Sequence, residues 1–211
     1  MTNPPRIPHS EAIQRLIDGN QRFVNGVRSV ESLLAHMKMA ELATKGQNPF
    51  AVVLTCSDSR SPAEMIFDQG LGDLFVVRVA GNVVAPSLLA SIEFAVSNLG
   101  SSAIVVLGHS LCGAIQATIQ HLQGPSSELA SPHLEELIGR IRPAVKAAEK
   151  SHDPLSSDFV HHATLSNIER SRRLILEQSR IVRDLHDAGK VSIEGALLDI
   201  ATGKVTFLGD T

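Results

Sequence analysis

Three short apolar runs, separated by helix-forming segments, constrain the fold of this chain more than any other feature. The runs read FAVVLT, DLFVVRVA and SAIVVLG, and they begin at Phe50, Asp73 and Ser102. Unbroken hydrophobic runs of this length are typical of parallel strands that are covered on both faces. The sequence therefore predicts an α/β fold with a mostly parallel central β-sheet flanked by helices.

Helical patterns surround these runs. The predicted helices span residues 10–26, 31–44, 86–99 and 112–122. Ser10 is the expected N-cap of the first helix, and Gly46 follows the end of the second. These two helices form an N-terminal arm of about residues 1–46 that precedes the first strand. We expect the arm to pack away from the sheet centre and against a partner subunit.

The last third of the chain predicts more helix and then a pair of strands. Residues 133–186 are helical in pattern, and Pro143 together with residues 151–154 should break this segment in two. The segments VSIEGALLDI and KVTFLG follow, separated by a turn at 201–203. They indicate a terminal β-hairpin, or a strand plus an edge strand.

Composition narrows the class of protein. With 43% hydrophobic and 19% charged residues, a chain of 211 residues can bury one substantial core, and we expect a single domain over residues 1–211. A formal net charge of -3 provides no basic surface for nucleic acid or anionic lipid. No apolar stretch is long enough to span a membrane, and the N-terminus lacks the apolar core of a secretion signal, so we expect a cytoplasmic protein.

The two cysteines lie directly after the first and third apolar runs. Cys56 begins the cluster CSDSR, and Cys112 lies in HSLCG, three residues after His109. Because the carboxyl ends of parallel strands meet at one edge of a sheet, we expect these two loops to lie side by side. Two thiolates and an imidazole are donors that Zn²⁺ prefers, and three protein ligands leave a fourth position open for catalysis. The pattern therefore predicts a catalytic zinc site.

Asp58 and Arg60 lie in the same loop as Cys56. Asp58 is either a fourth ligand or a group beside the metal, and Arg60 is spaced to hold its carboxylate through two hydrogen bonds. An Asp-x-Arg pair alone is usually a solvated salt bridge that contributes little to stability. Its place beside a metal ligand indicates a catalytic role instead.

Other interpretations of the cysteines stay open from the residues alone. A single buried cysteine is more often an inert core residue than a ligand, although its joint occurrence with the other donors argues against this. A thiol redox protein would use Cys56 and Cys112 directly, but no CxxC motif is present. A zinc-stabilised binding protein without catalysis would have lost the Asp58 and Arg60 pair, which is intact.

The joint pattern resembles the β-class carbonic anhydrases. Cys-x-Asp-x-Arg is followed about fifty residues later by His-x-x-Cys, and QNPFAVVLTCSDSRSPAE, DLFVVRVAGN, SIEFAV and VVLGHSLCG look like family segments. The resemblance implies that Cys56, His109 and Cys112 are zinc ligands and that Asp58 and Arg60 form a catalytic dyad. It also implies that Asp58 binds zinc only in a closed form of the site.

The resemblance further implies an activity and an assembly. The expected reaction is the reversible hydration of carbon dioxide to bicarbonate and a proton through zinc-bound hydroxide, by a homodimer or homotetramer. The substrate-binding residues that it implies are Gln47, Phe75, Val83, Phe94 and Gly113. Phe94 is expected to come from the neighbouring subunit. The alternative is hydrolysis of a related substrate, such as carbonyl sulfide or carbon disulfide, on the same zinc centre.

Overall fold

The computed structural model describes residues 6–30, 35–124 and 129–209, and one β-sheet organises them. Within these residues the strand order is β2-β1-β3-β4-β5. The strands are β1 (Ala51–Thr55), β2 (Leu74–Arg78), β3 (Ala103–His109), β4 (Ser192–Leu198) and β5 (Val205–Leu208). The first four are parallel and β5 is antiparallel to β4, which confirms the mostly parallel sheet and the terminal hairpin.

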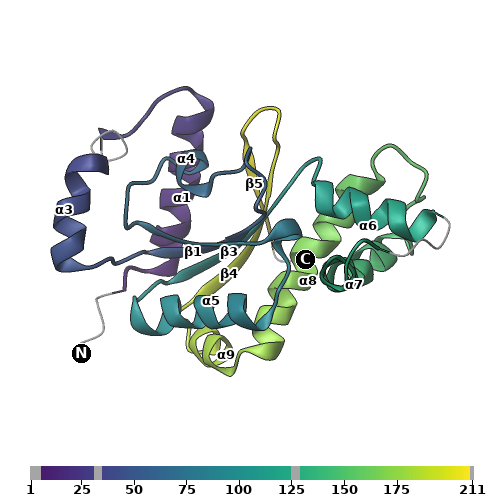
Figure 1. The fold of residues 1–211 in the computed structure, drawn as a ribbon. Helices are drawn as coiled ribbons and strands as arrows, with labels where there is room; N and C mark the ends of the chain where they lie inside the picture. The colour runs from purple at the N-terminus through teal and green to yellow at the C-terminus, as the bar shows by residue number, and fades with distance from the viewer. Residues whose placement is uncertain (1–5, 31–34, 125–128, 210–211) are drawn as a thin grey trace.

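Helices flank the sheet on both faces (Figure 1). They are α1 (His9–Val24), α3 (Ala35–Lys45), α4 (Ala63–Ile66), α5 (Pro86–Asn98), α6 (Gly113–Gln123), α7 (Pro132–Ala148), α8 (Phe159–Gln178) and α9 (Arg180–Asp187), with a 3₁₀ turn η1 (Ala80–Asn82). α1 and α4 lie on one face, α5 and α9 lie on the other, and α3 stands apart from the sheet (Figure 1). In the described part of the chain, no helix has both the length and the apolar character needed to cross a bilayer.

The apolar runs form strands because the sheet is buried on both sides. Every residue of β1 and β3 is buried. Successive side chains of a strand point to opposite faces, so Val52 and Leu54 pack with the core beneath α5, α8 and α9, whereas Val53 packs with the core beneath α1 and α4. A third apolar cluster joins α6, α7 and α8 and includes the two cysteines.

Strand order reverses at β1. The chain passes from β1 to β2 on one side, and then crosses to β3 on the other side of β1. In open parallel sheets, ligands bind in the crevice that such a reversal creates at the carboxyl ends of the strands. The loops that follow β1 and β3 therefore meet at the position where a site is expected.

The first helix packs on its own sheet, so the expectation that it lies away from the sheet centre is wrong. Ala12 and Leu16 of α1 are fully buried in the core of this subunit. A side chain at Gly19 would lie 1.8 Å from the Phe67 carbonyl oxygen, which explains how closely the helix approaches. The N-cap is Pro8, and Ser10, the predicted cap, already lies inside the helix.

The predicted arm helix over residues 31–44 is confirmed where it is described. α3 ends at Lys45, and Gly46 follows with a left-handed φ of 79°, as a terminating glycine should. Residues 31–34, where the helix was expected to begin, lie outside the described residues.

The long helical region is divided differently from the prediction. Pro143 lies inside α7 and does not break it, because the opposite face of α7 is held in the core by buried residues such as Ile141 and Val145. The break near residues 151–154 is confirmed, since α7 ends at Ala148 and α8 begins at Phe159. A second break at Ser179 was not predicted; there the serine hydroxyl accepts a hydrogen bond from a backbone N–H and caps α9.

Candidate metal centre

Cys56, His109 and Cys112 converge at the carboxyl ends of β1 and β3. Cys56 directly follows β1, His109 is the last residue of β3, and Cys112 is the N-cap of α6. Their two sulfur atoms and one imidazole nitrogen all lie within 4.8 Å of one another, and all three residues are buried. The pairing of β1 with β3 thus brings together the loops that the sequence predicts to meet.

A tight turn allows His109 and Cys112 to face the same point. Leu111 lies between them with a φ of 56°, a left-handed conformation that is uncommon for a leucine. Ser110 anchors the turn to the end of β4: its backbone N–H donates to the Leu198 carbonyl at 2.8 Å, and its hydroxyl accepts from the Ile200 N–H at 3.0 Å. Strain of this kind persists where the surrounding structure fixes it, which is common at functional sites.

The imidazole of His109 is oriented as a metal ligand. Its Nδ1 lies 2.9 Å from the Ser110 carbonyl oxygen, so Nδ1 carries the proton and donates, and Nε2 keeps its lone pair. Nε2 is buried and has no hydrogen-bond partner among the described residues. A buried nitrogen without a partner, facing two thiols, fits a metal ion, and this combination of donors is one that zinc prefers.

The three groups compete for protons. A hydrogen bond from the Cys112 thiol lowers the pKa of the Cys56 thiol, even though burial opposes its ionisation. The Cys56 sulfur, together with burial, raises the pKa of the Cys112 thiol. Burial opposes a charge on His109, but the Cys56 sulfur, the Ser110 carbonyl and the Asp58 carboxylate together outweigh burial and raise the pKa of the imidazole. A divalent cation removes the competition because it stabilises both thiolates at once.

Asp58 and Arg60 form the predicted two-point ion pair. Arg60 Nε lies 2.9 Å from Asp58 Oδ1, a terminal guanidinium nitrogen lies 2.7 Å from Oδ2, and the Arg60 backbone N–H also donates to Oδ1. The Arg60 guanidinium holds the pKa of the Asp58 carboxyl well below its usual range, so the carboxylate only accepts hydrogen bonds. Oδ2 lies 3.9 Å from His109 Nε2, at the edge of the ligand cluster.

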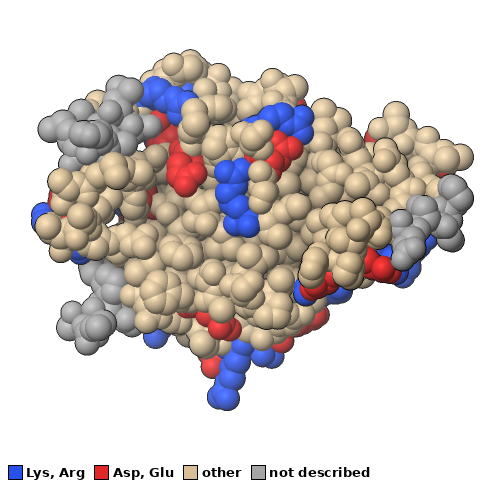
Figure 2. All heavy atoms as spheres, viewed as in Figure 1, with Lys and Arg blue, Asp and Glu red and all other residues tan. Residues whose placement is uncertain are grey.

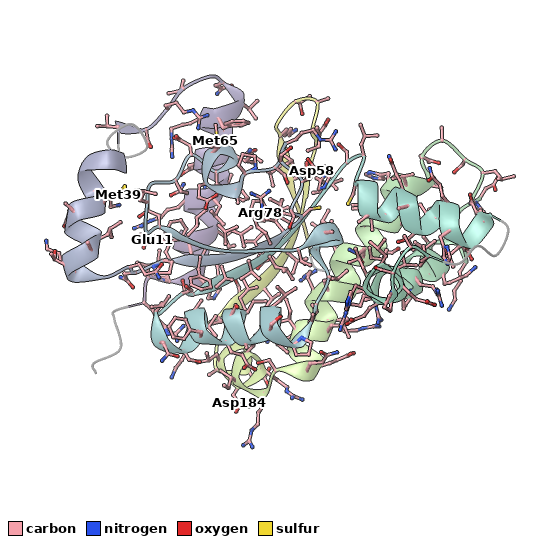
Figure 3. The ribbon with its side chains drawn as sticks, viewed as in Figure 1. Glu11, Met39, Asp58, Met65, Arg78 and Asp184 are labelled. Carbon is pink, nitrogen blue, oxygen red and sulfur yellow. The ribbon has the colours of Figure 1, made fainter. Side chains whose placement is uncertain are left out.

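Groups that the motif does not reveal hold the two loops in place. Arg78, the last residue of β2, donates to the carbonyl oxygens of Cys56 at 3.2 Å and Asp58 at 2.7 Å, and Figure 3 shows it close to Asp58. The backbone N–H of Gly81 donates to the Cys56 sulfur at 3.3 Å. Arg60 also reaches the carbonyl of Leu111 at 3.4 Å and so links the two loops. For Arg78, the available signal was a charged residue inside an apolar run.

Replacing Arg78 with glutamine is expected to weaken zinc retention by about 10- to 100-fold, because groups that orient metal ligands typically have effects of this size. The substitution removes the Arg78 guanidinium, which donates hydrogen bonds to the carbonyl oxygens of Cys56 and Asp58. The measurement is the rate of zinc transfer to a chromogenic chelator. Arg183→Gln, at an exposed arginine of α9, is the matched control, and equal rates for the two variants would show that Arg78 does not orient the loop.

Two of the predicted substrate-binding residues lie beside the metal ligands. Val83 is buried in the same apolar cluster as Cys56 and Cys112. Gly113 is the first residue of α6, and the space where its side chain would lie is open. An apolar wall and an unobstructed helix N-terminus therefore border the ligand cluster.

The other three predicted substrate-binding residues, Gln47, Phe75 and Phe94, lie outside the cluster of metal ligands. The rings of Phe75 and Phe94 contact each other, with 6.3 Å between centroids, and Phe94 is 49% exposed. Gln47 is exposed on the connection between α3 and β1. Among the described residues, no recorded hydrogen bond or ring contact joins Gln47, Phe75 or Phe94 to the metal ligands. Their role in the site remains a prediction.

Comparison with known proteins gives one consistent result. A family model described as carbonic anhydrase matches residues 51–205. The carbonic anhydrase of Mycolicibacterium smegmatis is 37% identical to this chain over 211 residues, which cover 97% of this chain and 98% of that protein.

Two solved structures share the fold. The Coccomyxa β-carbonic anhydrase in complex with acetazolamide matches with a TM-score of 0.72 and 24% identity, covering 93% of this chain and 86% of that one. A tetrameric β-carbonic anhydrase of Sordaria macrospora matches with a TM-score of 0.70 and 23% identity, covering 95% and 98%. Cys56, His109 and Cys112 therefore lie in a fold that this chain shares with both solved structures over most of its length.

Proposed function

The chain belongs to the β-class carbonic anhydrase family, and from this premise we propose how its residues carry out the reversible hydration of carbon dioxide to bicarbonate and a proton. The observation that carries the proposal is the convergence of Cys56, His109 and Cys112 beside a carboxylate held by arginine. Cys56, His109 and Cys112 hold zinc. Asp58 and Arg60 are the catalytic pair, and residues 1–211 act as one catalytic domain.

The donor set suits the metal and the reaction. Zinc supplies a Lewis acid that acidifies water, which makes a nucleophile for carbon dioxide available near neutral pH. The protein contributes two thiolates and one neutral imidazole whose proton is fixed on Nδ1 by Ser110. Three protein ligands leave room for a small molecule at the metal, which is the arrangement of catalytic rather than structural zinc sites.

Asp58 orients the reacting water through its carboxylate. Because Arg60 keeps the carboxylate ionised, Asp58 accepts a hydrogen bond and cannot donate one. Its oxygen lies 3.9 Å from His109 Nε2, close enough to the ligand cluster to act on a water held there. To become a ligand itself, Asp58 would have to give up its contacts with Arg60. We assign the arrangement with Asp58 on Arg60 to the active form and the other to a closed form.

The substrate pocket is completed by a second subunit. Val83 and Gly113 line the cluster from the same chain, and Phe75, Phe94 and Gln47 complete an apolar pocket with one polar end. Half of Phe94 is exposed, and Leu111, between two metal ligands, is 58% exposed. On the face drawn in Figure 2, a broad area below the central charged side chains is uncharged, which suits a contact between subunits.

We propose a homodimer or homotetramer, and a tetrameric relative of the same fold supports this. Light scattering on the purified protein should give an even number of subunits, and a monomer would contradict the shared pocket. We also propose the cytoplasm as its compartment, because Cys56 and Cys112 form no disulfide and a reducing environment keeps such cysteines available as metal ligands.

Stopped-flow carbon dioxide hydration, combined with metal analysis of the same sample, tests the proposed function. The expected result is one zinc per chain and rapid hydration, with slower turnover of carbonyl sulfide. A zinc-loaded protein without hydration activity would overturn the catalytic proposal. Preferential hydrolysis of carbonyl sulfide would instead change the substrate and leave the metal site unaffected.

A further inference from the structure

One arginine of α8 lacks a counter-charge in the described part of the chain. The Nε atom of Arg170 is buried without a hydrogen-bond partner, and no ion pair of its guanidinium is found among the described residues. Its neighbour Arg173 is paired with Glu177 at 3.3 Å. Arg170 as a whole is only partly buried, but buried donor atoms such as its Nε are normally satisfied. The unpaired Arg170 therefore requires an explanation.

Arg170 borders a small polar cavity of about 80 Å³ beneath η1. Its polar lining includes Arg140, Asn167, Arg170, Ser171 and Gln178. The guanidinium of Arg140 is already bound by Glu136 at 2.6 Å and by the Val84 carbonyl at 2.8 Å. Glu136 offsets the charge of Arg140, so the positive charge that Arg170 brings to the cavity is not neutralised.

The walls of this cavity are fixed before any ligand enters. The Asn167 amide donates to the Gly81 carbonyl at 2.8 Å, and the Ser171 hydroxyl donates to the Asn82 carbonyl at 3.1 Å. Both side chains are almost completely buried. A binding site whose walls are already ordered loses little entropy when it is filled.

We propose that this cavity binds a small oxyanion, with Arg170 as its main contact. The planar guanidinium presents parallel N–H donors that match the oxygen atoms of a bicarbonate, carboxylate, sulfate or phosphate group. The volume exceeds the roughly 30 Å³ share of one water in the liquid, so it admits an anion of a few heavy atoms. The site is separate from the metal cluster, since η1 lies between them and turns its Gly81 N–H toward Cys56 and its carbonyls toward α8.

Calorimetric titration of the zinc-loaded protein with phosphate, sulfate and bicarbonate tests the proposal. Anions that bind at the metal contribute equally to the wild type and to Arg170→Gln, so the difference between the two reports the cavity. We expect Arg170→Gln to weaken the cavity component at least about tenfold, as loss of a charge-assisted contact should. Arg140→Gln should also weaken anion binding in the cavity. Arg173→Gln, at an exposed arginine three residues after Arg170 on α8, should leave it unchanged. The anion that shows the largest difference identifies the physiological class.

Equal affinity and stoichiometry for the wild type and Arg170→Gln, with all three anions, would overturn the proposal. A structure of the assembled protein with a partner carboxylate on Arg170 would do the same. If Arg170→Gln folds poorly, Arg170→Lys keeps the charge but loses the fork, and its affinity should lie between those of the wild type and Arg140→Gln. The titration measures binding and not turnover, so its result does not depend on the proposed catalytic roles.

Discussion

Replacing Cys112 with serine is expected to empty the site of zinc and to lower carbon dioxide hydration by about 10³-fold or more. A serine hydroxyl stays protonated at neutral pH, so the variant loses one of two anionic ligands. Cys112 is 1% exposed, which leaves little room for water to take its place as a ligand. The Lewis acid contributes several kcal/mol to the reaction, and its loss accounts for the expected size of the effect.

Metal analysis and stopped-flow hydration on the same sample measure both consequences. Ser59→Ala is the matched control, because Ser59 is exposed in the loop between Asp58 and Arg60, and its side chain makes no hydrogen bond to any residue that the structure describes. It should keep its zinc and most of its activity. A Cys112→Ser protein that retains one zinc per chain and wild-type turnover would rule out Cys112 as a ligand.

The strands and the ligand cluster were predictable from sequence because each depends on local patterns. FAVVLT and SAIVVLG have the pattern of buried parallel strands, and strands that end next to each other bring Cys56 and His109 together whatever the details of the helices. Helix boundaries were less predictable because tertiary packing overrides local preference. Pro143 is tolerated inside α7 because the buried face of that helix holds it straight, and α1 packs on its own sheet because Gly19 allows close approach.

The supporting contacts could not be read from the sequence because they depend on register and on main-chain atoms. Arg78 reaches the carbonyls of the Cys56 loop because β2 pairs with β1 so that Thr55 lies opposite Arg78. The N–H of Gly81 reaches the Cys56 sulfur because of the geometry of the 3₁₀ turn η1. No residue type in the sequence predicts this main-chain geometry. The pocket residues Phe94 and Gln47 are harder still, since their proposed role depends on a second subunit.

Asp58→Asn is expected to lower turnover by about 10²- to 10³-fold while zinc stays bound. The amide keeps the shape of the carboxylate, but it loses the ion pair with Arg60. It also places an N–H₂ donor where the side chain has to accept a hydrogen bond from the reacting water. Asp184→Asn is the matched control, because Asp184 also pairs with an arginine, Arg180, and lies far from Asp58 in Figure 3. Full turnover in Asp58→Asn would reject the proposed role.

The pH dependence separates Asp58 from the other groups of the site. Arg60 depresses the pKa of Asp58, so the carboxylate stays ionised at neutral pH and through the range where an ordinary aspartate gains its proton. Its contribution to activity is therefore complete near neutral pH and is lost only in strong acid. A limb of the pH–rate profile between about pH 5 and 9 must come from another group, and it should persist in Asp58→Asn, with its midpoint lowered by loss of a nearby negative charge. Disappearance of the limb in this variant would show that Asp58 itself titrates there.

The same pair allows a test of whether Asp58 and Arg60 act as one unit. Arg60→Gln removes the guanidinium that fixes both carboxylate oxygens, and we expect it to lose activity comparable to that lost by Asp58→Asn. Residues that act through each other are strongly non-additive, so the double variant should be little worse than either single one. Multiplicative losses would mean that Arg60 contributes mainly through its contact with the Leu111 carbonyl, which holds the Cys112 loop, and not through Asp58.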